Sequence, residues 1–181
     1  DFDRCTGLLS NQVSFFVPSP GIGAGVAVSP NSRFAYLSSN EHIYQYDLWE
    51  ADVEASKDTV GFYDGLELPF STGFQLAQLA PDGKIYLTTS GATSFLHIIH
   101  NPDLMGDSCN VDLRGIELPT FNAWTMPNFP NYRLGKLEGS ACDTLPDKPI
   151  ADFDFEINNL EVQFTDLSQN EPTAWKWYFK D

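Results

Sequence analysis

Three histidines are the side chains of this sequence best suited to bind a metal ion or to move a proton near neutral pH. His97 and His100 stand three positions apart in an apolar segment, and His42 stands well before them. Side chains along a strand alternate between its two faces, so an offset of three places His97 and His100 on opposite faces. They cannot easily share a metal ion, and we expect packing or hydrogen-bonding roles for these histidines.

A row of acids offers a second candidate chemistry. Asp152, Asp154 and Glu156 occupy every second position, so they share one face of an extended strand. Carboxylate oxygens suit Ca²⁺ when they converge from loops, but a straight row does not converge. The Asp-x-Asp-x-Asp-Gly spacing of a calcium loop is also absent. We expect a solvated face and no cofactor, with Ca²⁺ as the alternative.

The sequence contains no motif of catalysis or nucleotide binding. It has neither a Gly-x-Ser-x-Gly elbow nor a Gly-Lys-Ser/Thr phosphate loop. The glycines between Gly21 and Gly25 lack the following helix of a dinucleotide site, and we expect them to let the chain turn closely into a strand. We therefore predict no catalytic residue and a chain that is not an enzyme.

Several aromatic residues of the C-terminal half could stack on sugar rings: Trp124, Phe129, Tyr132, Trp175 and Trp177. Aromatic side chains more often fill the core of a β domain, because each buries roughly 150–250 Å². Trp124 is the strongest exception, since it stands beside a segment expected to form an inner strand. Trp124 and Trp177 are the candidate ligand-stacking residues.

The cysteines do not form a zinc motif, which needs paired ligands at short spacing. Cys5, Cys109 and Cys142 permit one disulfide in three ways, with one thiol left over. Buried reduced thiols are one interpretation, and a secreted protein with one bridge is the interpretation that we favour. The sequence does not choose the pair.

Composition excludes some partners. The 181 residues include 25 acidic and 10 basic side chains, which gives a net charge of −15. Nucleic acid and anionic membranes require a positive patch, so neither is an expected partner. No apolar run is long enough to insert into a membrane, and no signal peptide or initiator Met opens the chain. We expect a processed or trimmed piece of a longer protein.

A repeated scaffold must position the candidate residues. Pro18, Pro69 and Pro119 each precede a similar segment, and their spacing resembles the roughly 40–50 residues of a four-stranded propeller blade. Apolar and alternating segments predict four strands in each of two units: 26–28, 34–37, 43–48 and 60–63, then 74–79, 84–89, 95–100 and 111–118. We predict an all-β chain with two or so blades and few helices.

Two blades cannot close a ring, because each blade buries its faces only against neighbours. Residues 1–12 look like the outer part of a preceding blade, and residues 122–133 like the inner strand of a following one. The region 1–135 is therefore predicted to be the C-terminal part of a larger propeller. Its expected partners are other protein chains or the remainder of its own chain.

The amino-acid composition of the sequence changes after residue 135. Residues 136–148 are rich in Gly, Ser, Asp and Pro and predict a linker. Residues 149–181 predict a second domain, with strands at 151–157, 160–164 and 174–179.

This last region resembles a PKD domain, an immunoglobulin-like β-sandwich. The resemblance rests on Ala-Asp-Phe at 151–153, Val-Gln-Phe-Thr-Asp-Leu-Ser at 162–168 and Trp-Tyr-Phe-Lys-Asp at 177–181. Lys180 departs from the family pattern, which usually has Gly there. The resemblance implies the first strands of a sandwich whose remaining strands lie outside this sequence.

Residues 1–135 resemble the C-terminal end of the propeller region that precedes PKD repeats in large secreted proteins of Bacteroidota. The resemblance rests on the segments 2–7, 28–34, 78–86 and 127–134. It implies export, through type IX secretion, and a role at the cell surface in adhesion, gliding motility or polymer binding. It also implies candidate O-glycosylation at Asp-Thr-apolar triplets, here at Thr59 and Thr144.

Two functions from different classes follow. The leading prediction is a non-enzymatic, secreted or cell-surface module for adhesion, surface-filament assembly or the binding of polymers, proteins or glycans. The alternative is an accessory binding region of a secreted polysaccharide- or protein-degrading enzyme whose catalytic domain lies outside this chain. A structural spacer that binds nothing is a third possibility.

Overall fold

The computed structural model describes residues 1–14, 17, 25–127, 139–140, 149–159, 161–170 and 172–176. The chain divides into two compact units, one formed by Val13–Arg133 and the other by Asp1–Gln12 together with Leu134–Asp181. All the sheets are antiparallel, and the only helix in the described part is a 3-10 turn, η1, at Gly106–Cys109. The predicted all-β class is therefore confirmed. No helix among the described residues is long and apolar enough to cross a membrane.

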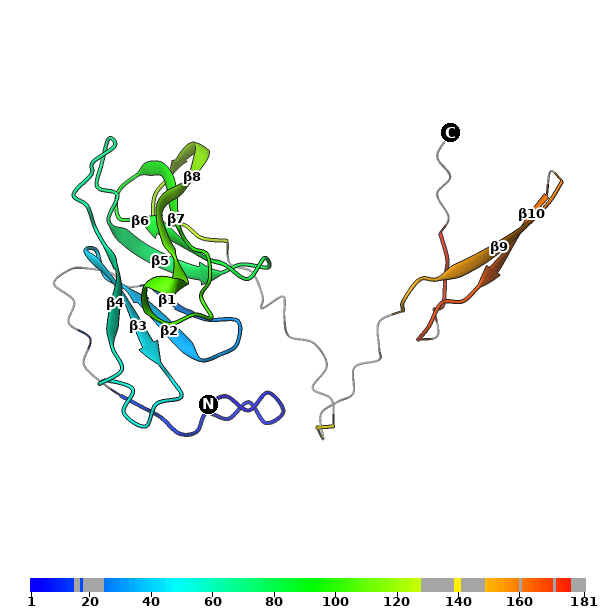
Figure 1. The fold of residues 1–181 in the computed structure, drawn as a ribbon, viewed down its shortest axis with the longest axis horizontal. Helices are drawn as coiled ribbons and strands as arrows, with labels where there is room; N and C mark the ends of the chain where they lie inside the picture. The colour runs from blue at the N-terminus through cyan, green and yellow to red at the C-terminus, as the bar shows by residue number, and fades with distance from the viewer. Residues whose placement is uncertain are drawn as a thin grey trace. The chain divides into compact units, whose positions relative to one another are not determined.

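The first unit contains two four-stranded sheets, each with its strands in chain order (Figure 1). The first sheet consists of β1 (Gly25–Val28), β2 (Phe34–Ser38), β3 (His42–Asp47) and β4 (Asp58–Phe62). The second consists of β5 (Phe74–Leu79), β6 (Ile85–Thr89), β7 (Thr93–Ile99) and β8 (Val111–Asn122). All eight strands overlap the predicted segments, and Gly83 supplies the predicted turn residue, with φ at 85°.

The register of the hairpins defines which residues are equivalent in the two sheets. Val28 pairs with Ala35 in the first sheet, and Leu79 pairs with Ile85 in the second. The second hairpin loop is therefore one residue shorter. Beyond the loop, Tyr36 corresponds to Tyr86 and Leu37 to Leu87. Because strand side chains alternate, Tyr36 and Leu37 mark opposite faces of their sheet, as Tyr86 and Leu87 do.

The two sheets pack through unlike faces. Tyr36 and Ile43 of the first sheet share a buried cluster with Ile85, Leu87 and Ile99 of the second. The opposite face of the first sheet, on the side of Leu37, belongs to a separate cluster of Ala35, Tyr44, Tyr46 and Val53. The Tyr36 face of one sheet thus meets the Leu87 face of the next, which is a head-to-tail arrangement.

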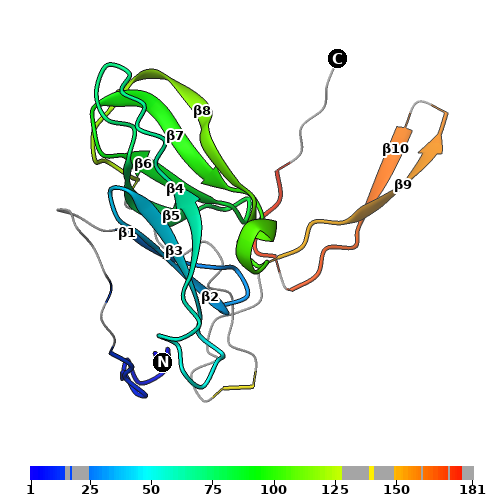
Figure 2. The same cartoon turned by 60° about the vertical axis from the view of Figure 1, so that its left-hand side comes forward.

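The closest contact between the sheets lies where β1 passes β5 (Figure 2). Ser38 donates its hydroxyl to the carbonyl of Gln75, and Phe74 donates its amide to Asn40 over 3.0 Å. A Cβ atom on Gly25 would overlap the backbone of Gln75 and Ala77. Glycine at this position lets the two backbones touch, as expected for the end of the Gly21–Gly25 run.

The second unit contains the antiparallel hairpin of β9 (Phe153–Asn158) and β10 (Glu161–Asp166). Phe155 pairs with Phe164, and Phe153 packs edge-on against the Phe164 ring at 5.8 Å between centroids. The strand predicted at 174–179 is wrong over its described residues, 174–176, which lie outside any strand. A strand needs a ladder of backbone partners, and no strand of the described residues pairs with 174–176.

Residues 1–12 form a tight loop closed by a single bridge between Phe2 and Leu9. The Asp3 carboxylate accepts hydrogen bonds from the amides of Cys5 and Thr6, which lowers its pKa. This loop contains no named strand of the kind expected for the outer part of a blade.

Candidate functional site

Trp124 follows the end of β8 in a sparsely populated backbone conformation. Its φ is 54°, in the left-handed region that non-glycine residues rarely adopt. The indole Nε1–H donates to the carbonyl of Ser90 in the β6–β7 turn. The side chain is still 55% exposed, so its one polar atom is satisfied while the ring remains open to solvent. A ring held in this way is suited to stacking.

A short polar network holds the loop that presents Trp124. Asn122 donates from Nδ2 to the carbonyl of Thr125 over 2.9 Å, and its Oδ1 accepts from the Thr125 amide and hydroxyl. Asn122 itself pairs with Thr93 at the start of β7. The left-handed backbone of Trp124 thus lies between Asn122 and Thr125, which hydrogen bonds hold in place.

The β6–β7 turn is joined on its other side to the connection between β4 and β5. Gly91 donates its amide to the Ser71 carbonyl over 2.9 Å, and the Ser90 and Ser71 hydroxyls lie 3.0 Å apart. A Cβ on Gly91 would lie 2.6 Å from the Cβ of Phe70, whose side chain is 55% exposed. Phe70 and Trp124 therefore flank the same turn. We call Phe70, Ser71, Ser90, Gly91 and Trp124 the Trp124 platform.

Buried polar contacts fix the connection beneath the platform. His97 lies in the interior, and its Nε2 is 2.8 Å from the Thr72 carbonyl while its Nδ1 accepts the Arg114 amide over 3.2 Å. The neutral tautomer with a proton on Nε2 satisfies both contacts. The Arg114 guanidinium also reaches the Thr72 hydroxyl and binds Asp64 at 2.6 Å.

The charges beneath the platform follow from these contacts. Burial lowers the pKa of His97 to about 4, so the imidazole is neutral near pH 7. The Arg114 hydrogen bond lowers the pKa of Asp64, which keeps that carboxylate ionised. The Asp64–Arg114 pair thus ties the start of the connection to β8, and no ionisable group belongs to the platform itself.

The other histidines lie apart from His97 in the described structure. His100 Nε2 contacts the Asp112 carboxylate at 3.3 Å, and His42 stacks on Tyr44 with its edge toward Phe62. No group of three His, Cys, Asp or Glu side chains that could hold a metal occurs in the described part of the chain. Hydrogen bonding and packing are thus the observed roles of the histidines, as predicted.

The structure describes three of the residues predicted for a disulfide or for O-glycosylation, namely Cys5, Cys109 and Thr59. Cys5 is disulfide-bonded, whereas Cys109 is a free thiol that is fully buried, and burial raises its pKa to about 11. Thr59 lies half-buried in β4 opposite Tyr44. Cys142, Thr144 and Trp177 lie outside the described residues.

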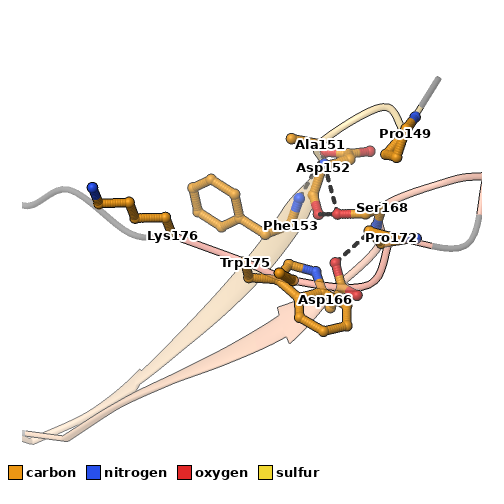
Figure 3. A pocket seen from close by; sticks show the side chains of 10 residues that line it. Pro149, Ala151, Asp152, Phe153, Asp166, Ser168, Pro172, Trp175 and Lys176 are labelled. Carbon is orange, nitrogen blue, oxygen red and sulfur yellow. Dashed lines mark hydrogen bonds between the residues drawn. The ribbon is translucent and has the colours of Figure 1, made fainter.

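A hollow of about 260 Å³ lies beside β9 and β10 (Figure 3). Asp166 accepts hydrogen bonds from Ser168, which lower its pKa, and Ser168 contacts the backbone of Asp152. Asp154 and Glu156 lie on the exposed strand β9 itself. The predicted acidic row is thus split, because Asp152 precedes the strand and lines the hollow.

The sequence singled out Trp124 but not the residues around it. Phe70 and Ser71 stand in a connection without periodicity, and they meet Ser90 only through the tertiary fold. The Ser90-Gly91 pair was available as a signal, because Ser-Gly dipeptides mark turns. The platform can stack on a flat apolar surface. Its two hydroxyl protons are already engaged, because Ser90 donates to Ser71 and Ser71 donates to the Tyr63 hydroxyl.

Comparison of the chain with models of protein families, with curated proteins and with solved structures finds no match.

Proposed function

We propose that this chain is a non-enzymatic binding module whose Trp124 platform stacks on neutral sugar rings. The observation that carries the proposal is the exposed Trp124 ring, held by its own N–H on the Ser90 carbonyl. The hydroxyls of Ser71 and Ser90 lie at the turn that Trp124 and Phe70 flank. Aromatic faces with a few polar groups nearby are the common composition of small-ligand sites.

The net charge narrows the class of ligand. At −15, the chain repels anionic polymers over the distance of a Debye length. Neutral glycans with equatorial hydroxyls avoid this repulsion and present flat C–H faces to an aromatic ring. We therefore favour neutral β-linked glycans over uronic-acid or sulfated polymers.

We also propose that the two sheets are neighbouring blades of a β-propeller and that β9–β10 opens a PKD-type sandwich. The head-to-tail packing of the Tyr36 face on the Leu87 face supports the first part, since a ring of blades requires such unlike contacts. The row of Phe153, Phe155 and Ile157, all about half exposed or more, supports the second, because a sandwich would bury that face.

The proposed setting is secretion to the cell surface, where the module would serve adhesion or surface-filament assembly. The disulfide at Cys5 supports it, because disulfides persist in oxidising compartments. The same glycan binding would also serve the alternative, an accessory region of a secreted polymer-degrading enzyme.

Binding of cellohexaose, xylohexaose and mannohexaose by isothermal titration tests the proposal. We expect at least one to bind and Trp124→Ala to weaken that binding about tenfold or more, the usual cost of losing a central aromatic contact. Trp175→Ala is the matched control, since Trp175 is similarly exposed, at 54%, but lies in the other unit, and it should bind as the wild type does. Binding that survives Trp124→Ala would refute the platform.

A further inference from the structure

Strand β8 carries a large bulge beside the connection that supplies part of the Trp124 platform. The single residue His97 of β7 lies opposite three residues of β8, 113–115. The middle one, Arg114, has a φ of 59°, in the left-handed region that residues other than glycine rarely adopt. Bulges re-aim side chains and occur often next to functional sites, and a costly backbone conformation points to a role in such a site.

The bulge gives Arg114 contacts in two directions. Its amide donates to the Nδ1 atom of His97 over 3.2 Å. Its guanidinium binds both carboxylate oxygens of Asp64, at 2.6 and 3.2 Å, and donates to the Thr72 hydroxyl over 3.3 Å. The Arg114 side chain is only 19% exposed, so water and salt screen these contacts less than they screen an ion pair at the surface. One side chain therefore links β8 to both ends of the segment from Asp64 to Thr72.

Residues 66–72 form a small loop that carries Phe70, and we call it the Phe70 loop. Thr72 closes the loop at its base, because its amide and its hydroxyl both donate to the carbonyl of the first loop residue, over 3.1 and 2.9 Å. The loop meets the β6–β7 turn where Gly91 donates its amide to the Ser71 carbonyl. These bonds hold the loop together, but its position against the turn depends on what fixes its base.

We propose that Arg114 is a positioning residue of the Trp124 platform, because it fixes the base of the Phe70 loop to β8. Without the guanidinium, the loop keeps its internal hydrogen bonds but loses its side-chain link to β8. The Phe70 ring then leaves the β6–β7 turn for part of the time, and a glycan has to order the loop when it binds, which lowers the affinity. The inference rests on the glycan binding proposed above, whereas the order of the loop is measurable without any sugar.

Amide hydrogen exchange of the sugar-free protein tests the positioning itself. Arg114→Gln should raise the exchange rate of the Gly91 amide about tenfold or more, because it removes charge-assisted hydrogen bonds, whose loss typically has an effect of that size. Arg33→Gln is the matched control, since Arg33 forms an ion pair of the same length, 2.6 Å, with Asp47 of the first sheet. It should leave the exchange of Gly91 unchanged. Unchanged Gly91 exchange in Arg114→Gln would overturn the proposal.

Titration of the hexaose that the wild type binds tests the consequence for the site. Arg114→Gln should weaken binding about threefold or more, the effect of ordering one or two side chains on binding. Arg114→Lys, which keeps a positive charge for Asp64, should restore part of the affinity, and Arg33→Gln should bind as the wild type does. If Arg114 only stabilised the fold, Arg114→Gln would lower the urea midpoint and leave the affinity unchanged, and that result would also overturn the proposal.

Two further outcomes are separated by the same measurements. If circular dichroism shows Arg114→Gln unfolded, Asp64→Asn replaces it, because it weakens the same link and keeps an acceptor for the Leu66 amide. If the wild type binds none of the hexaoses, the proposed glycan binding fails, and the exchange of Gly91 alone then decides whether Arg114 positions the Phe70 loop.

Discussion

At the scale of residues, Trp124 combines an unusual backbone with an exposed ring. A non-glycine residue in the left-handed region costs on the order of 1–3 kcal/mol, and surrounding structure must compensate. Here the compensation comes from the Ser90 carbonyl and from the Asn122–Thr125 network. The core gains little from this conformation, because the ring stays more than half exposed. The proposed binding role is the explanation that we offer for this conformation.

His97 should make the stability of the first unit depend on pH. Its pKa is about 4 when folded and near 6.5 in a free chain, so the unfolded state takes up a proton that the folded state does not. The contribution is complete above about pH 6.5 and is lost as the pH falls toward 4, on the order of 3 kcal/mol in total.

Urea denaturation at pH 7 and at acid pH measures this effect. We expect His97→Gln, which can still donate to Thr72 and accept from Arg114, to show a smaller loss of stability on acidification than the wild type. His100→Gln, whose histidine is partly exposed beside Asp112, should lose stability as the wild type does. An unchanged pH dependence in His97→Gln would contradict the buried neutral histidine.

Part of the site could be predicted at this scale and part could not. Strand alternation alone separated His97 from His100, and the structure places hydrogen bonds on both. The partners of His97 could not be predicted, because Thr72 lies in a connection whose course is set by the packing of two sheets. For the same reason, the sequence indicated Trp124 but gave no sign of Phe70.

At the scale of elements, the contact between β1 and β5 determines how closely the two sheets approach. All eight strands of the first unit could be predicted, because period-two alternation and turn residues are local signals. The residue pairing within each hairpin could not be predicted from the sequence. The second hairpin has a loop one residue shorter than the first, and this difference leaves the apolar pattern almost unchanged. The loop length nevertheless determines which face of one sheet is equivalent to which face of the other.

Gly25→Ala should destabilise the first unit, because the added Cβ would overlap the backbone of Gln75 and Ala77. Overpacking a rigid contact typically costs about 1–3 kcal/mol. Val26→Ala is the control at the next position, where the side chain is 60% exposed, and it should change stability by less than about 0.5 kcal/mol. Chemical denaturation measures both variants, and a Gly25→Ala protein as stable as the wild type would disprove close packing of β1 on β5.

At the scale of the whole molecule, the chain combines a repeated two-sheet unit with a separate unit that contains a small hairpin. The sequence alone indicated the repeat and the change of amino-acid composition near residue 135, and the structure divides the chain at Arg133. The grouping of Asp1–Gln12 with the C-terminal unit could not be predicted, because the sequence of a short polar loop does not indicate which part of the chain it contacts. The Trp124 platform and Arg114 both belong to the first unit, so changes in the β9–β10 hairpin should leave the proposed binding intact.

Amide hydrogen exchange with the hexaose that binds in the titration tests the central claim, a glycan site on the Trp124 platform, most directly. The account predicts that saturating sugar slows exchange in the β6–β7 turn, at Ser90 and Gly91, and in the loop from Asn122 to Thr125. The β9–β10 hairpin should exchange as it does without sugar. Slowed exchange confined to β9–β10, with the turn and the Trp124 loop unchanged, would contradict the account.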